Sequence, residues 1–389
     1  MIYFDNGATT FPKPKSVVNA VNYAITKIGA NPGRGGHNMA MKASEVLFEC
    51  RNNAATLFNI DNSENIIITN NCTTALNTVI KGILKSGDHA VISSYEHNAV
   101  VRPLEFLKNR GVEYSIAQVD YADNEKTVDN FRKAFKENTR LVICTHASNV
   151  FGIRLPIERI AALCKLNGIL FCVDAAQTAG LIPIYLKNSD IDYLCTAGHK
   201  GLYGPMGTGL LIINSKVIPE SLIQGGTGSL SAQVNQPEIL PDKFESGTCN
   251  LPGICGLLKG IEFIEKTGIQ KIHNHEFMLL ELLYSKLKCI KNVKLYTPKP
   301  EINYNAPLLS FNIGDMPSEQ VAEILDKKYN IAVRAGLHCA PTAHKKLGTE
   351  TQGTVRISLS YFNTTSHINS VSNAVKNISD FYSKKINIK

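Results

Sequence analysis

The chain reads TAGHKGLYGP from residue 196 to residue 205, a turn rich in glycine and proline around a single lysine, Lys200. An apolar run from Ile191 to Cys195 precedes the turn, and a second run from Gly209 to Ile213 predicts a buried strand after it. A lysine at the end of a strand can present its amine to a cleft, where loss of water lowers its pKa and frees it to react with an aldehyde. Taken alone, the stretch favours an ordinary surface lysine in a loop.

A second stretch upstream favours a cofactor site. Residues 173–177 read VDAAQ and place Asp174 at the end of the apolar run from Ile169 to Cys172. Pyridoxal phosphate (PLP) chemistry requires a lysine for the cofactor aldehyde and an acid for the pyridinium nitrogen. We therefore expect a PLP site that contains Lys200 and Asp174.

The chain between these stretches alternates strand and helix patterns, which predicts an α/β fold with a mainly parallel sheet between helices. We expect seven strands, at 66–69, 90–92, 112–117, 141–144, 169–173, 191–195 and 209–213. We expect helices at 17–28, 40–58, 75–84, 99–108, 128–136 and 156–166.

After residue 255 the pattern changes to that of a smaller α+β unit. The expected helices lie at 253–267, 273–289, 318–329 and from 365 onward, and the expected strands at 308–313, 331–333 and 354–359. We therefore predict a large domain over 15–255 and a small domain formed by 1–14 and 256–389.

Polar residues follow the predicted strands, where ligands of parallel sheets bind. They include Thr73, Thr74, His97, Asn149, Asp174, Gln177, His199 and Lys200. Thr73 and Thr74 begin a helix, and hydroxyl and N–H groups at a helix start can hold a phosphate. Capping of that helix by Thr74 is the simpler alternative.

A second chemical centre reads RAGLHCAP, residues 334–341. Cys339 stands there beside His338 and Arg334, and a thiol near cationic groups has a larger reactive thiolate fraction. Taken alone, this Cys–His pair is weak evidence and favours a purely structural cysteine. Arg356 lies in the predicted strand 354–359, where its planar fork could bind a substrate carboxylate or simply face water.

Composition excludes several classes of function. Of 389 residues, 44% are hydrophobic and 19% charged, and the net charge of +8 is scattered, so we expect small anions rather than nucleic acid as partners. The ten cysteines show no zinc-binding spacing, so we expect no metal and a reducing, cytoplasmic compartment. Neither a signal peptide nor an apolar run able to span a bilayer is evident.

Together, these motifs resemble the cysteine desulfurase family, a class-V aminotransferase-like group of fold-type I PLP enzymes. The matching motifs, in the family's order, are YFDNGATT (3–10), EHN (96–98), SNVFG (148–152), VDAAQ (173–177), GHK (198–200) and RAGLHCA (334–340). The short loop around Cys339 resembles that of the sulfur-mobilising and selenocysteine lyase-like members.

The resemblance implies a role for each residue. Lys200 would carry PLP and move the substrate's α-proton, Asp174 would keep the ring nitrogen protonated, and His97 would stack on the ring. Gln177 would bind the ring oxygen, and Asn149, Arg334 and Arg356 would bind the substrate. The phosphate would be held by Thr73, Thr74 and His199, with Thr248 from the second subunit of a homodimer.

The implied reaction converts L-cysteine to L-alanine and leaves a persulfide on Cys339 for a sulfur-acceptor protein. Selenocysteine lyase and class-V aminotransferase activity on another amino acid are the alternatives. The sequence departs from the family at Ala197, often Ser, and at Leu337, commonly His. The sulfur could serve iron–sulfur cluster assembly, thiolated tRNA or selenium metabolism.

Overall fold

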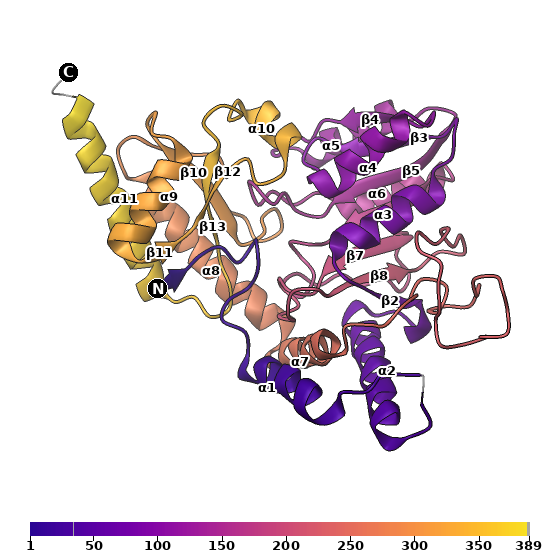
Figure 1. Cartoon of the computed structure of the whole chain (residues 1–389). Helices are drawn as coiled ribbons and strands as arrows, with labels where there is room; N and C mark the ends of the chain where they lie inside the picture. Colours follow the sequence, from indigo (N-terminus) through magenta and orange to yellow (C-terminus); the bar gives the residue numbers. More distant parts are fainter. Residues whose placement is uncertain (34, 387–389) are drawn as a thin grey trace.

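A large seven-stranded sheet and a smaller four-stranded sheet form the two halves of the chain in Figure 1, a computed structural model that describes residues 1–33 and 35–386. The large sheet has the order β2-β8-β7-β6-β5-β3-β4, and β8 runs antiparallel to the other six strands. Its strands are β2 (Ile66–Thr69), β3 (His89–Ser93), β4 (Glu113–Ala117), β5 (Thr139–Thr145), β6 (Leu170–Asp174), β7 (Tyr193–Ala197) and β8 (Gly209–Ile213). The seven-stranded, mainly parallel sheet expected from the sequence is confirmed.

Helices cover both faces of this sheet, which explains why its central strands are buried runs rather than alternating ones. One face packs against α3 (Cys72–Ile83) and α4 (Asn98–Lys108). The other face packs against α2 (Asn38–Phe58), α5 (Asn124–Ala134), α6 (Ile157–Leu166) and α7 (Leu251–Thr267). The first helix, α1 (Lys15–Tyr23), ends in a π-helical turn (Ala24–Ile28) and packs on α7.

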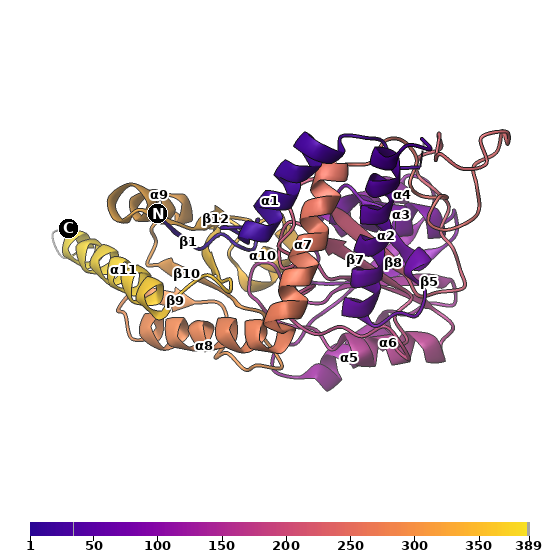
Figure 2. The ribbon, with the colours of Figure 1, turned by 90° about the horizontal axis from the view of Figure 1, so that it is seen from below.

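The smaller half has its own core around an antiparallel sheet of order β12-β13-β10-β9. Its strands are β9 (Val293–Leu295), β10 (Leu308–Ile313), β12 (Arg334–Gly336) and β13 (Thr354–Ser358). Its helices are α8 (Ile269–Lys288), α9 (Ser318–Tyr329), α10 (Pro341–Leu347) and α11 (Thr365–Ile386). Figure 2 shows α8 continuing from the end of α7 along this half. The division of the chain into domains at residue 255 stays a prediction.

The N-terminus belongs spatially to the smaller half. β1 (Ile2–Tyr3) pairs in parallel with β11 (Ile331–Ala332), and Phe4 is fully buried in the core of that half. The chain then passes toward the large sheet, so residues 5–10 lie between the two halves.

Three short elements were missed by the sequence analysis: β9, β12 and α10. Each is too short for a clear hydrophobic period. Pro341 reads as a breaker but occupies the first turn of α10, where proline is tolerated because its missing N–H has no helical partner anyway. No helix in the described ranges, 1–33 and 35–386, is long and apolar enough to cross a membrane.

Candidate active site

The turn that carries Lys200 leaves the end of β7 and is held by close backbone contacts. A Cβ at Gly198 would lie 2.2 Å from Thr208 Oγ1, and a Cβ at Gly201 would lie 2.4 Å from the Ala179 carbonyl oxygen. The Lys200 carbonyl accepts hydrogen bonds from Thr10 Oγ1 (2.9 Å) and from the Tyr203 N–H (2.9 Å). Glycine is therefore required on both sides of the lysine, because any side chain would displace the turn.

A cavity of about 240 Å³ opens in front of this turn, between the carboxyl ends of the large sheet and the smaller half. Its wall brings together residues that the sequence analysis singled out from separate motifs. They are Thr73, His97, Asn149, Asp174, Gln177, His199, Lys200, Arg334 and Arg356.

Asp174 ends β6, between β5 and β7, and is almost fully buried. Its Oδ1 accepts a hydrogen bond from the Ala176 N–H (2.9 Å) and a weaker one from Cys72 Sγ (3.5 Å). Burial lowers the pKa of Lys200, while the Asp174 carboxylate acts in the opposite direction. The cavity thus combines an amine poised for deprotonation with a buried carboxylate.

His97 lies at the N-terminal cap of α4. Its Nδ1 accepts a hydrogen bond from the Ala99 N–H (3.0 Å), so in the neutral ring the proton is on Nε2. Burial lowers the pKa of His97, with Asp174 opposing this shift. A neutral imidazole therefore faces the cavity at pH 7.

Arg356 lies on β13 and is buried between the two halves. Its Nη2 forms an ion pair with Asp5 Oδ1 (2.8 Å), and its Nη1 donates to the Asn149 carbonyl oxygen (2.8 Å). Its Nε has no partner in the described part of the chain, although the atom is buried. A guanidinium with unused donor capacity in the cavity wall suits a carboxylate ligand.

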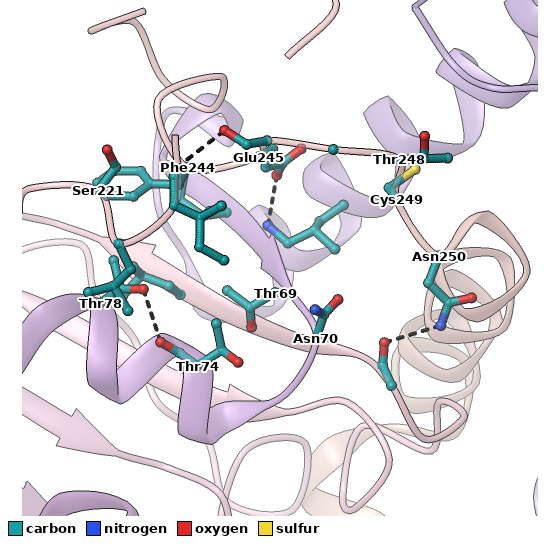
Figure 3. Close-up of a pocket in the computed structure, with 18 of the residues that line it drawn as sticks. Thr69, Asn70, Thr74, Thr78, Ser221, Phe244, Glu245, Thr248, Cys249 and Asn250 are labelled. Carbon is teal, nitrogen blue, oxygen red and sulfur yellow. Dashed lines mark hydrogen bonds between the residues drawn. The ribbon is translucent and has the colours of Figure 1, made fainter. Parts of the chain in front are cut away.

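Thr73 and Thr74 separate in the structure. Asn71 caps α3, since its Oδ1 accepts from the Thr74 N–H at 2.8 Å, so the alternative of capping by the Thr74 side chain is wrong. Thr73 lines the Lys200 cavity, whereas Thr74 points to a neighbouring pocket of about 150 Å³ together with Thr248 (Figure 3). Within this chain, Thr74 and Thr248 do not reach the Lys200 cavity.

Cys339 lies in the loop between β12 and α10, exposed, and is not part of the cavity wall. Its carbonyl accepts from the Asn98 N–H (2.8 Å), and the preceding carbonyl, of His338, accepts from Asn149 Nδ2 (2.7 Å). Burial lowers the pKa of His338 to about 2, so its ring is neutral. The expectation that His338 is a cationic neighbour of the thiol is therefore wrong, and the same expectation for Arg334 stays a prediction.

Two residues of the site had no role in the sequence analysis: Asp5 and Cys72. Asp5 pairs with Arg356, and Cys72 contacts Asp174. Asp5 lies inside a motif that the analysis quoted. No local pattern could have shown the partner of either residue.

The residues of this cavity fit PLP. They supply the amine and the carboxylate that the cofactor requires. One polar atom of a residue in the cavity wall, His199 Nδ1, is buried and without a partner in the described ranges. Such an atom is expected where a polar ligand completes the hydrogen bonding.

Comparisons with known proteins agree with this geometry. The family profile described as aminotransferase class-V matches residues 2–371. A probable cysteine desulfurase of Methanothermobacter thermautotrophicus is 36% identical, with 94% of this chain and 92% of that protein covered. A probable cysteine desulfurase of Pyrococcus abyssi is 34% identical, with 93% and 90% covered.

Two solved structures extend the similarity to three dimensions. The apo structure of a cysteine desulfurase from Thermococcus onnurineus NA1 matches with a TM-score of 0.89 and 32% identity, with 97% of this chain and 94% of that chain covered. The cysteine desulfurase CsdA from Escherichia coli, solved in an S-sulfonic acid form, matches with a TM-score of 0.86 and 26% identity over the same shares.

Proposed function

The chain belongs to the aminotransferase class-V family, and we propose that it is a PLP-dependent cysteine desulfurase that converts L-cysteine to L-alanine. The observation that carries this proposal is the placement of Lys200, Asp174 and Arg356 in one buried cavity. The loop of Cys339 is attached to the same cavity through the Asn149–His338 hydrogen bond.

PLP, when bound, supplies an electron sink for the substrate's α-carbon. Lys200 would hold the cofactor and then act as base, because its lowered pKa leaves a fraction of the amine unprotonated. Asp174 would face the ring nitrogen and stabilise its protonated form. His97 would present its neutral ring, and Gln177 and His199 would add hydrogen bonds at the edges of the cavity.

Arg356 and Asn149 would orient the substrate through its carboxylate, with Arg334 nearby in the same wall. An arginine fork binds a carboxylate with defined geometry, which would aim the substrate's sulfur toward the loop of Cys339. The ion pair with Asp5 would keep the Arg356 fork in position before the substrate arrives.

Cys339 would then attack the sulfur of bound cysteine. A new S–S bond forms as the C–S bond breaks, the electron pair of the broken bond stays with carbon, and a proton on that carbon yields alanine. The persulfide left on Cys339 would pass to an acceptor protein, since the exposed loop gives a partner access. The ten cysteines are all free thiols, which favours a reducing, cytoplasmic compartment.

We also propose a homodimer. Thr74 and Thr248 share one pocket outside the Lys200 cavity (Figure 3), a position compatible with a role of Thr248 at the phosphate site of a second subunit. The large-domain and small-domain division at residue 255 belongs to the same proposal.

The test replaces Cys339 by serine and uses Cys289→Ser as a matched control, because these two cysteines are the exposed ones. With L-cysteine as substrate, Cys339→Ser should lose sulfide and persulfide formation by at least about 100-fold and still bind the cofactor. Cys289→Ser should retain both. Full alanine formation from L-cysteine by Cys339→Ser would contradict the proposal. Alanine formation by the unaltered protein from selenocysteine but not from cysteine would favour a selenocysteine lyase.

A further inference from the structure

The backbone of the Cys339 loop has an unusual conformation at the cysteine itself. His338 and Cys339 have positive φ angles of 49° and 58°, and no other two adjacent non-glycine residues in the described ranges share this property. At such angles the Cβ lies close to the following carbonyl oxygen, so residues other than glycine adopt them rarely and usually singly. Strained backbone of this kind persists only where surrounding contacts fix it.

Two hydrogen bonds from the half that contains the large sheet fix this conformation. Asn149 Nδ2 donates to the His338 carbonyl oxygen (2.7 Å), and the backbone N–H of Asn98 donates to the Cys339 carbonyl oxygen (2.8 Å). Asn149 follows β5 and Asn98 begins α4, so the two donors come from separate segments. The peptide groups on both sides of the Cys339 Cα are therefore held by this large half.

The smaller half holds the same loop through a side chain. His338 Nε2 donates to the carbonyl oxygen of Thr354 (3.0 Å), the first residue of β13. Within the loop, the Ala340 N–H donates to the Leu337 carbonyl oxygen (3.0 Å). His338 thus joins the two halves, and the position of Cys339 depends on contacts with both.

Asn149 also belongs to the active-site cavity. Its carbonyl oxygen accepts from Arg356 Nη1 (2.8 Å), and the residue lines the cavity wall beside Arg356 and His338. A side-chain amide nitrogen carries two hydrogens, and in the described ranges only the bond to His338 uses one of them. The other stays available to a carboxylate, so Asn149 connects the proposed substrate site to the backbone of Cys339.

We propose that the Asn149 amide and the Asn98 N–H are positioning groups that hold Cys339 in its strained conformation, within reach of the sulfur of bound cysteine. The inference rests on the proposed function of Cys339 and adds no bond-making step to it. Loss of either hydrogen bond would let the loop relax and would move the thiol. Proton transfer at Lys200 precedes the attack of the thiol and would be unaffected by the Asn98 bond.

The first test replaces Asn98 by proline, which lacks the N–H and is favoured at the first position of a helix. His97, which precedes it, has the extended backbone that a residue before proline requires. The ring carbon takes the place of the hydrogen, so the Cys339 carbonyl must move. Turnover of L-cysteine should fall on the order of 100-fold, as for a displaced reacting group, with an unchanged KM.

Asn124→Pro is the matched control. Asn124 is the first residue of α5 and also follows a residue with extended backbone, and it lies outside the cavity wall. This variant should keep the turnover and the KM of the unaltered protein.

Exchange of the α-proton of L-alanine with D₂O, followed by NMR, separates a positioning role from a general structural one. Alanine has no sulfur, so its exchange needs the cofactor and the Lys200 amine but not Cys339. Asn98→Pro should therefore exchange this proton as fast as the unaltered protein. Equal loss of exchange and turnover in Asn98→Pro would overturn the proposal, because the N–H would then serve the whole site.

Hydrogen–deuterium exchange of the loop amides, measured by mass spectrometry, tests the two hydrogen bonds without any reaction. Peptides that cover residues 336–341 should exchange about 5- to 10-fold faster in Asn149→Ala and in Asn98→Pro, because each lost bond makes local opening easier. Asn214→Ala is the control for Asn149→Ala, since the Asn214 amide also donates to a backbone carbonyl, that of Ile191 (2.9 Å). It should leave the loop unchanged.

Two results would contradict the proposal further. Loop exchange unchanged in both Asn149→Ala and Asn98→Pro would show that these bonds do not hold the loop. Faster loop exchange with unchanged turnover in Asn98→Pro would show that the held conformation does not serve the reaction. If Asn98→Pro does not fold, Asn149→Ala and its control decide the exchange measurement. Failure of the proposed function would instead appear as no alanine from cysteine in the unaltered protein, where the loop amides still report on the two bonds.

Discussion

At the scale of single residues, the site depends on two buried groups of opposite charge whose environments differ. Burial lowers the pKa of Lys200, and the nearby Asp174 carboxylate opposes this shift. His97 and His338 are neutral for the same reason, burial. The local chemistry is therefore set by desolvation more than by direct ion pairs.

Replacement of Lys200 by alanine tests the cofactor assignment. Lys200→Ala should abolish the visible absorbance of the purified protein, because the amine that would bond the cofactor aldehyde is lost. Lys243→Ala is the control, since Lys243 is also buried but forms an ion pair with Glu238 outside the cavity. Retained absorbance in Lys200→Ala, measured after dialysis, would defeat the assignment.

At the scale of elements, the Lys200 turn shows how backbone packing determines where a side chain points. Gly180 and Gly201 approach each other so closely that a Cβ on Gly180 would lie 2.4 Å from the Gly201 carbonyl oxygen. The turn after β7 therefore packs in direct backbone contact with the segment that follows Asp174. This contact helps to fix the position of the Lys200 backbone relative to the strand that carries Asp174.

Gly201→Ala should disturb this packing. We expect a loss of about 1–3 kcal/mol in the free energy of unfolding, as for other overpacked sites, and weaker retention of the cofactor. Urea unfolding and dialysis against buffer measure the two effects. Gly36→Ala is the control because no described atom lies within 4 Å of its added Cβ. Cofactor affinity equal to that of the unaltered protein in Gly201→Ala would show that the turn tolerates a side chain.

At the scale of the whole molecule, the active-site cavity is a product of two separate cores. The N-terminal strand is anchored in the smaller core by Phe4, and the next residue, Asp5, holds Arg356 across the cavity. Ser358 on β13 binds the Phe4 carbonyl oxygen through its N–H (2.8 Å) and its hydroxyl (3.0 Å). Stability of the smaller half and the position of Arg356 are therefore linked.

Phe4→Ala should reveal this link. Loss of a fully buried phenyl ring costs about 3–5 kcal/mol in the free energy of unfolding, and Phe4→Leu should cost less than about 1.5 kcal/mol. The KM for cysteine should rise in Phe4→Ala because Asp5 no longer holds Arg356. If Phe4→Ala is destabilised but its KM for cysteine, measured below its unfolding temperature, is unchanged, then anchoring by Phe4 does not affect substrate binding and the prediction is wrong.

The sequence alone determined the class of the fold and the identity of the chemical groups. Apolar runs and helical periods are local patterns, so the seven strands of the large sheet were predictable within 66–213 and its covering helices within 40–267. The likeness of several motifs to one family, all in the family's order, pointed to the cofactor and to Lys200, Asp174 and Cys339 before any contact was known. The three elements it missed are too short to have a period.

Only the tertiary structure decided which groups meet. Asp5 and Arg356 are 351 positions apart, and Glu276, on a helix of the other half, lines a small cavity together with Lys200. Thr73 and Thr74 are neighbours in the chain, yet the helical rotation of about 100° per residue sends them to different pockets. Which side chains meet in this way depends on packing between segments that are far apart in the chain, and a local sequence pattern carries no information about that packing.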